Sequence, residues 1–359
     1  MMEKKDNETV QQSLTRLIVE EITGQPFNEV KVTVGPLVTN YFSFVFFIET
    51  YTGRNKQRVF VKIPKEDLRQ RSKSILPITT TDRRMAWDEE LSLRMLGEHW
   101  QSDDLDVFWI RLRGVFPQYN AVVTDATQGD DALAVFRRLD MNRRFGLNKD
   151  CIRLREAMAR LGTALGRFHQ RNAQNIVFRL NETMLKLEEY CHKIESSIRS
   201  PWTKNVIQVL DPFSDTEIET LEVTTLKGID IRNIQIDKQN KLFLLDPGRM
   251  KRTCREADLA RFIMTYRILY WGSGLFFLRL MPDLQAEAAF LKAYYLNSDP
   301  PSPKLLSIYL VKEQLKHWHT AIDSLWRLSW PIPIKRLVEA TYVNPFYKRQ
   351  IEIELKKVF

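Results

Sequence analysis

The sequence contains few cysteines and few glycines. Its three cysteines, Cys151, Cys191 and Cys254, are widely spaced. This spacing excludes a disulfide framework and a zinc-binding pattern, and it predicts reduced thiols. The glycines form no glycine-rich phosphate-binding motif, because a lone Gly35 between the first two predicted strands is no evidence for one.

A long uninterrupted apolar segment is also missing. The longest apolar stretch, residues 268–281, contains two glycines, a serine and an arginine. It is too short and too interrupted to span a bilayer. The first residues, 1–12, are polar and have no apolar core of a secretory signal. These features predict a cytoplasmic protein without a transmembrane segment.

The charge is strongly biased towards basic residues. The net charge of +9 and the pI of about 9.3 favour anionic partners such as a nucleotide, a phosphorylated sugar or a membrane surface. The basic residues form only modest clusters, at 137–144 and 251–255, so there is no strong signal for nucleic acid. With 44% apolar and 28% charged residues, the composition is that of a globular protein.

Hydrophobic periodicity divides the chain into a strand-rich first part and a helical second part. The first part is predicted to contain helices at 9–22 and 83–98 and strands at 30–38, 41–49, 58–63, 107–116 and 119–124. The second is predicted to contain helices at 131–139, 150–172, 181–199 and over most of 256–329, with two short strands within 224–246. This pattern predicts an α+β fold with an N-terminal extension, a β-rich nucleotide-binding lobe, a helical lobe and a basic aromatic tail, at 1–27, 28–127, 128–330 and 331–359.

The segment from Asn233 to Gly248 has the pattern of a metal site. Asn233 precedes a short hairpin, and the apolar run 242–245 ends in Asp246, Pro247 and Gly248. An amide and a carboxylate on neighbouring elements are two hard oxygen ligands of the kind that hold Mg²⁺ on ATP phosphates. Asn233 and Asp246 are therefore the predicted metal ligands, and ATP and Mg²⁺ the predicted cofactors.

A lysine and a glutamate in the first part fit the same chemistry. Lys62 lies in the β-branched strand RVFVKIP, from which an ammonium can reach the α- and β-phosphates. Glu89, in the following helix, is the predicted partner that holds it, with Glu90 as the alternative.

Two further segments are candidates for nucleotide contacts. Thr39 and Ser43, between the first two strands, are predicted to cover the phosphates. Val123 and Thr124 are predicted to lie in a hinge whose backbone binds the adenine edge, and Gly129 is expected to give the following turn its conformational freedom.

Over about residues 28–270 the chain resembles the aminoglycoside phosphotransferase and choline kinase-like branch of the protein-kinase fold. The resemblance is carried by VFVKIP around Lys62, by LGTALGRFHQRN at 161–172 and by NIQIDKQNKLFLLDPGRMKRTCREADLA at 233–260. It implies a two-lobe fold and transfer of the γ-phosphate of ATP to a small-molecule hydroxyl. It also implies that Asp258 holds the catalytic loop, whereas His169 is expected to be a buried structural residue.

The catalytic loop departs from the family pattern. Where the family has His-Gly-Asp, this chain has Leu226, Lys227 and Gly228, so the aspartate that serves as the base in the family is absent. Asp230, two residues further on, is the candidate replacement, and Lys227 is a candidate for offsetting charge on the transferred group.

Two functions follow from these observations. The first is an ATP-dependent kinase whose acceptor is a sugar, a sugar-lipid or a similar molecule, and the basic charge favours an anionic acceptor. Members of the family often act in antibiotic resistance or polysaccharide synthesis. The second is a pseudokinase that binds nucleotide, or has lost it, and acts as a scaffold or regulator, as Gly228 suggests.

The C-terminal tail leaves a third possibility open. Aromatic residues such as Trp330 and Tyr347 alternate there with basic residues such as Lys335 and Arg349. This pattern is compatible with peripheral contact to an anionic membrane and with a terminal helix packed on the helical lobe.

Overall fold

The computed structural model describes residues 2–40, 42–53, 55–66, 74–100, 102–198, 202–271 and 280–358. The chain forms two compact units. The β-rich unit comprises Met1–Asp131 and Asn233–Met250, and the helical unit comprises Ala132–Arg232 and Lys251–Phe359. The predicted α+β class is confirmed. The hairpin segment at 233–250 lies with the N-terminal residues, whereas the sequence pattern assigns it to the helical part.

The main sheet of the β-rich unit has the strand order β1-β3-β4-β7-β6, with β2 paired to β3. All of its pairings are antiparallel. The strands are β1 (Lys31–Val34), β2 (Val38–Thr39), β3 (Ser43–Thr52), β4 (Asn55–Pro64), β6 (Leu112–Phe116) and β7 (Ala121–Asp125).

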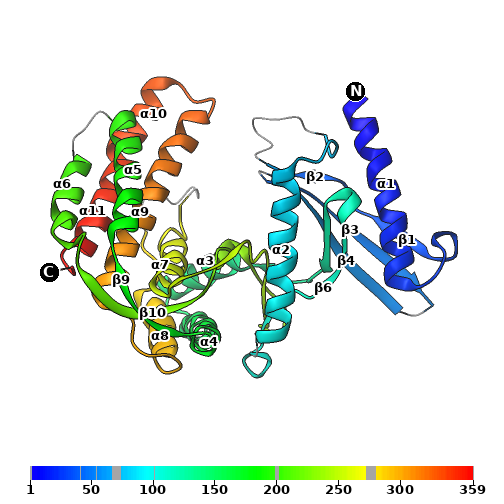
Figure 1. The fold of residues 1–359 in the computed structure, drawn as a ribbon, viewed down its shortest axis with the longest axis horizontal. Coiled ribbons are helices and arrows are strands. Elements are labelled where there is room, and N and C mark those ends of the chain that lie inside the picture. The colour runs from blue at the N-terminus through cyan, green and yellow to red at the C-terminus, as the bar shows by residue number, and fades with distance from the viewer. Residues whose placement is uncertain are drawn as a thin grey trace. The chain divides into compact units, whose positions relative to one another are not determined.

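The two faces of this sheet pack against different helices, α1 (Met2–Thr23) and α2 (Thr80–His99) (Figure 1). Side chains alternate between faces along a strand. On β7, Val123 packs in the same cluster as Leu14 and Ile18 of α1, whereas its neighbour Val122 packs with Leu93 of α2. The sheet therefore presents one face to each helix.

A second, four-stranded sheet incorporates the hairpin of the β-rich unit. Its order is β5-β12-β11-β8, and its strands are β5 (Val107–Trp109), β8 (Asp130–Asp131), β11 (Ile234–Ile236) and β12 (Leu242–Leu244). The single strand predicted at 107–116 is wrong, because these residues form β5 and β6 in different sheets. The cause is the parallel pairing of β5 with β12, a long-range contact that local periodicity does not reveal.

Gly129 has a structural role different from the predicted one. It is not among the described residues with a left-handed backbone. A Cβ at this position would lie 2.9 Å from the backbone nitrogen and carbon of Ile236. Glycine is thus needed here for a close approach of two chain segments rather than for its conformational freedom.

The helical unit is built around α9, which packs against α5, α7 and α11, while α4 packs along α8 (Figure 1). A three-stranded sheet of order β13-β10-β9 accompanies these helices. The helices and strands of the helical unit are α3 (Ala132–Arg144), α4 (Asn148–Arg171), β9 (Gln174–Arg179), α5 (Asn181–Ile198), α6 (Trp202–Leu210), β10 (Glu217–Leu226), β13 (Met250–Cys254), α7 (Glu256–Arg267), α8 (Leu284–Tyr295), α9 (Pro303–Arg327), α10 (Ile332–Val338) and α11 (Asn344–Leu355). A π-helical turn lies at Glu339–Val343.

The C-terminal tail packs onto the helical unit. Tyr347 is 1% exposed and stacks on Trp318 of α9. Glu354 accepts a hydrogen bond from the Arg267 guanidinium at 2.7 Å, also in a buried position. Trp330 and Ile332, in contrast, are exposed. The tail is therefore largely part of the core of this unit, as in the second of the two predicted arrangements.

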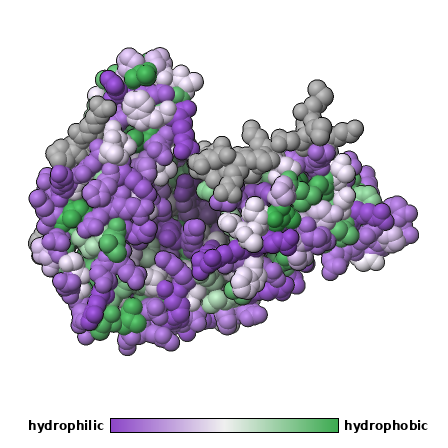
Figure 2. Space-filling view, turned by 45° about the horizontal axis from the view of Figure 1, so that its top comes forward, coloured by the Kyte–Doolittle hydropathy of each residue, from purple (hydrophilic) through white to green (hydrophobic). Residues whose placement is uncertain are grey.

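The surface in Figure 2 is mainly hydrophilic, and apolar side chains gather on it in small groups. Among the residues that the structure describes, no helix is both long and apolar enough to cross a bilayer.

Candidate functional site

Strand register places Lys62 on the α2 face of the main sheet. Lys62 is paired with Val122 of β7, which packs with Leu93 of α2. Directly paired residues share a face, and the neighbours Val61 and Ile63 pack on the opposite face with α1. The alternation along RVFVKIP thus directs the lysine towards α2.

The partner of Lys62 is Glu89 on α2. This helix begins with a capping box between Thr79 and Asp82, and it buries Leu93 on the sheet side. Glu89 lies one turn before Leu93 and shares its face. Lys62 Nζ lies 2.8 Å from Glu89 Oε2 and 2.9 Å from Asp246 Oδ1. The structure therefore brings together three residues that the sequence predicts to bind nucleotide and metal.

Burial and charge oppose each other in this trio. Burial alone would lower the pKa of Lys62, but the carboxylates of Glu89 and Asp246 outweigh it and raise this pKa above its ordinary range. Burial raises the pKa of Glu89, and the Lys62 ammonium opposes that rise. The side chains of Lys62 and Glu89 are 17% and 8% exposed, whereas that of Asp246 is 49% exposed. Asp246 is thus the member of the trio that faces solvent.

Two residues after β12 have a left-handed backbone conformation, which favours glycine, asparagine and aspartate. Asp246 has φ of 47° and Gly248 has φ of 61°, both in the left-handed region. The carbonyl of Gly248 accepts a hydrogen bond of 2.7 Å from the hydroxyl of Ser92, which lies on α2 three residues after Glu89. One face of α2 therefore positions both the lysine and the turn that carries Asp246. Ser92 is a positioning residue that the sequence analysis missed, although its spacing from Glu89 is a detectable signal.

Asn233 lies at the same end of the hairpin as Asp246. The backbone N–H of Leu245 donates to the carbonyl of Asn233 at 2.7 Å, so Asn233 sits beside the residue that precedes Asp246. An amide oxygen and a half-exposed carboxylate fit Mg²⁺, which keeps several water ligands and takes others from substrate phosphates. Within the described ranges, no group of three His, Cys, Asp or Glu side chains is placed to hold a metal ion.

The remaining predicted nucleotide contacts occupy different environments. Thr39 is exposed at the end of β2, whereas Ser43, the first residue of β3, is buried. Val123 and Thr124 lie inside β7, which is paired on both sides, with β4 and β6. Both residues thus lie within a strand paired on two sides, and their contact with an adenine edge stays a prediction.

In the helical unit, Asp258 holds the beginning of loop 226–232. Its carboxylate is fully buried, and Oδ2 accepts a hydrogen bond of 2.6 Å from the backbone N–H of Leu226. His169 lies 3.4 Å from the same oxygen, and its other ring nitrogen is 2.9 Å from the Tyr294 hydroxyl. The structural roles predicted for Asp258 and His169 are confirmed by these contacts.

Asp230, within the same loop, is engaged by Arg232. The backbone N–H of Arg232 and its Nε both donate to Asp230 Oδ1 at 2.9 Å, and Nη2 also pairs with Oδ2. Lys227 is exposed, and Gly228 is buried. The candidate base therefore has a guanidinium partner that the sequence analysis did not identify, two residues along the chain.

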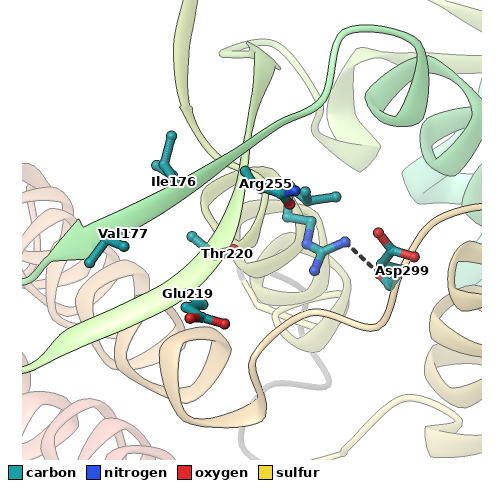
Figure 3. A pocket seen from close by; sticks show the side chains of 8 residues that line it. Ile176, Val177, Glu219, Thr220, Arg255 and Asp299 are labelled. Carbon is teal, nitrogen blue, oxygen red and sulfur yellow. Dashed lines mark hydrogen bonds between the residues drawn. The ribbon is translucent and has the colours of Figure 1, made fainter.

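A pocket elsewhere in the helical unit contains none of these residues. It has a volume of about 470 Å³ and is lined by β9, β10, Arg255 and Asp299 (Figure 3). The Arg255 guanidinium donates to Ser298 Oγ at 3.2 Å and to the Pro300 carbonyl at 2.7 Å. Through these hydrogen bonds Arg255 holds the segment at 298–300 in place.

Comparison of the fold with solved structures identifies small-molecule kinases. A choline kinase from Cryptosporidium parvum Iowa II matches with a TM-score of 0.53 at 9% identity, over 97% of this chain and 95% of its own. A choline/ethanolamine kinase family protein from Mesorhizobium loti matches with a TM-score of 0.51 at 13% identity, over 97% and 98% of the two chains. An amicoumacin kinase in complex with AMP-PNP, Ca²⁺ and its antibiotic matches with a TM-score of 0.51 at 12% identity, over 94% and 93%.

No family model matches the sequence, and no curated protein matches it. The structural similarity nevertheless extends over nearly the whole chain. The protein has the protein-kinase-like fold that choline kinases and antibiotic phosphotransferases share, as its sequence predicts.

Proposed function

We propose that this protein is an ATP-dependent phosphotransferase of the small-molecule kinase type. The observation that carries the proposal is the contact of one buried lysine, Lys62, with both Glu89 and Asp246. The acceptor in this proposal is a hydroxyl of a sugar, a sugar-lipid or a similar molecule. The solved kinases of the same fold act on small molecules, and one of them holds an ATP analogue.

Each residue has a role in the proposed reaction. Lys62 binds the nucleotide phosphates, and Glu89 keeps its ammonium in place. Asp246 and Asn233 supply ligand oxygens for Mg²⁺, which offsets the charge of the phosphates when it is bound. Since Lys62 already contacts Asp246 at 2.9 Å, nucleotide phosphates that attract the lysine would leave that carboxylate oxygen for the metal.

The acceptor proton is assigned to Asp230. In the proposed step the acceptor oxygen forms a bond to the γ-phosphorus, the bond to the β-phosphate oxygen breaks, and the hydroxyl proton passes to the Asp230 carboxylate. Lys227 offsets charge on the transferred group. Phosphoryl transfer with a loose transition state depends more on positioning and charge than on a base, so the absence of an aspartate at Gly228 is compatible with turnover.

The test is transfer of label from γ-labelled ATP to a panel of sugars, amino alcohols and glycan lipids. We expect one class of acceptor to be labelled by the wild type and not by Asp246→Asn. The matched control is Asp323→Asn, since the Asp323 side chain is 48% exposed, close to the 49% of Asp246. Equal labelling by wild type and Asp246→Asn would contradict the proposal, because the activity would then not depend on the metal ligand.

A pseudokinase is the second candidate function. It is favoured by Gly228 in place of the base and by the engagement of Asp230 with Arg232. In this case ATP binds but no acceptor of the panel is labelled. Loss of nucleotide binding altogether would leave only a scaffold or regulatory role.

A further inference from the structure

Four basic residues from three elements of the helical unit are linked electrostatically, because three of them act on the fourth. They are Lys251 of β13, Arg261 of α7, and Lys312 and Lys316 of α9. We call them the cationic cluster. Burial lowers the pKa of Lys312, Glu313 opposes this change, and each of the other three members of the cluster lowers the pKa further.

The cluster adjoins the start of loop 226–232. Arg261 Nη1 donates to the carbonyl of Leu226 at 3.1 Å. The carbonyl of Lys251 accepts a hydrogen bond of 3.0 Å from the Thr225 hydroxyl. The Arg261 side chain and the Lys251 backbone are thus hydrogen-bonded to the residues at which β10 passes into the loop that carries Lys227 and Asp230.

Lys312 has no carboxylate partner among the residues that the structure describes. Its ammonium lies 4.8 Å from the ring centre of Tyr309, and no carboxylate of the described residues is within ion-pair distance of it. A half-buried lysine without a counter-ion loses hydration and gains only a weak cation–π contact. An anion bound at this position would remove that cost.

The carboxylates nearby do not balance the cluster. Glu313 is 2.9 Å from Lys316 and buried, and Asp258 is 3.5 Å from Arg261 but also bonds to Leu226. Among the described residues, two carboxylates therefore form ion pairs with members of the cluster, which has four basic groups. His317 adds no charge near neutral pH, because burial and then Lys316 lower its pKa to about 4. Lys251 is exposed and the Lys316 side chain is 39% exposed, so the excess positive charge is open to solvent.

We propose that the cationic cluster binds an anionic group, a phosphate or a carboxylate, of the phosphoryl acceptor beside loop 226–232. This inference rests on the proposed function, and it specifies the acceptor as an anion-bearing hydroxyl compound. Oriented ammonium and guanidinium groups bind such anions through charge-assisted hydrogen bonds. The anionic group comes either from a soluble phosphomonoester or from a lipid headgroup.

The first experiment measures binding of glycerol 3-phosphate, with uncharged glycerol as the comparison, by calorimetry on the full chain without nucleotide. We expect glycerol 3-phosphate to bind and each of Lys312→Gln and Lys251→Gln to weaken binding about tenfold. Lys251 is exposed, so this variant keeps the test valid if Lys312→Gln does not fold. Lys292→Gln, at an exposed lysine of α8, is the matched control and should bind as the wild type does.

Lys62→Met separates the cluster from the nucleotide site. If binding of glycerol 3-phosphate is lost in Lys62→Met and unchanged in Lys312→Gln and Lys251→Gln, the anion occupies the nucleotide site and the inference is wrong. Absence of binding to glycerol 3-phosphate and to phosphatidylcholine vesicles containing phosphatidic acid would also overturn it. Binding to the vesicles alone, lost in Lys251→Gln, would identify a lipid as the source of the anion.

Failure of the inference is distinguishable from failure of the proposed function. If an uncharged acceptor is phosphorylated equally by wild type and Lys251→Gln, the proposed kinase activity is supported and the proposed anion site is contradicted. If no acceptor is phosphorylated but glycerol 3-phosphate binds in a Lys312-dependent manner, the proposed anion site is supported and the proposed kinase activity is contradicted.

Discussion

The β-rich unit and loop 226–232 of the helical unit differ in how closely they follow the pattern of kinases. In the β-rich unit Lys62, Glu89 and Asp246 are in direct contact, and Ser92 holds the turn after Asp246. In the loop, Gly228 stands where the family that the chain resembles has an aspartate, and Asp230, two residues further on, is paired with Arg232. The residues proposed to bind nucleotide are all present and in contact, whereas the residues proposed to activate the acceptor differ from the kinase pattern.

This difference bears on which part of the proposed reaction tolerates change. The proposed nucleotide contacts depend on a buried lysine that two carboxylates hold, so loss of either carboxylate would remove one of its two ion pairs. A general base contributes less to phosphoryl transfer than positioning and charge do. Replacement of the base together with the cationic cluster is therefore compatible with a kinase that acts on a different kind of acceptor.

The largest effect is expected from removal of the lysine in the β-rich unit. Lys62→Met should lower transfer about 10²–10³-fold, because it removes a charge that stabilises the phosphates. The measurement is labelling of acceptor by γ-labelled ATP. Lys56→Met on the same strand, where the side chain is 45% exposed and pairs with Glu49, is the control and should retain activity. Equal loss in both variants would mean that the effect is one of folding.

The next effect distinguishes a kinase with a relocated base from one without a base. Asp230→Asn should lower transfer about 10²-fold, at the low end of what a general base contributes, and leave ATP binding unchanged. Asp215→Asn, at an exposed position of the helical unit, should have no effect on either quantity. If transfer by Asp230→Asn equals that of the wild type, Asp230 is not the proton acceptor and the loop acts only through position and charge.

A smaller effect concerns the close approach in the β-rich unit. Gly129→Ala introduces a Cβ 2.9 Å from the backbone of Ile236, and we expect a loss of about 1–3 kcal/mol in the free energy of unfolding. Denaturant titration measures it. Gly97→Ala on α2 is the control, because a Cβ there meets no atom within 4 Å and alanine favours the helix. Equal stability of both variants would show that the Gly129 backbone adjusts freely.

The last effect, which concerns stability alone, is a pH dependence in the helical unit. Burial and Lys316 lower the pKa of His317 from its ordinary 6.5 to about 4. Between these values the unfolded chain binds the proton and the folded chain does not, so stability should fall as the pH decreases from 6.5 towards 4.

Urea titration over this pH range tests the effect, and His317→Gln should reduce the slope of stability against pH. His192→Gln, at an exposed histidine of α5, is the control. An unchanged slope in His317→Gln would show that His317 is not the group responsible.

Local patterns in the sequence predicted much of the β-rich unit. The alternation around Lys62 fixed its face, and the apolar run before Asp246 marked a strand with a polar end. What the sequence did not show depends on contacts between distant segments. The pairing of β5 with β12 brings together residues 107 and 242, and the close approach at Gly129 involves Ile236.

The helical unit was harder to predict for the same reason. The cationic cluster joins residues 251, 261, 312 and 316, which no single motif contains. Lys312 and Lys316 are spaced four apart on one helix face, and this is the signal that a sequence can offer. The pairing of Asp230 with Arg232 depends on the conformation of a loop, about which spacing gives no information.

The most direct test of the account is a thermal-shift titration with ATP and Mg²⁺ on the wild type, Asp246→Ala and Asp323→Ala. A ligand that binds the folded state raises the melting temperature by linkage. We predict a concentration-dependent rise in the wild type and in Asp323→Ala, and none in Asp246→Ala. No rise in the wild type at millimolar ATP, or an equal rise in Asp246→Ala, would contradict the assignment of Lys62, Glu89 and Asp246 as a nucleotide site.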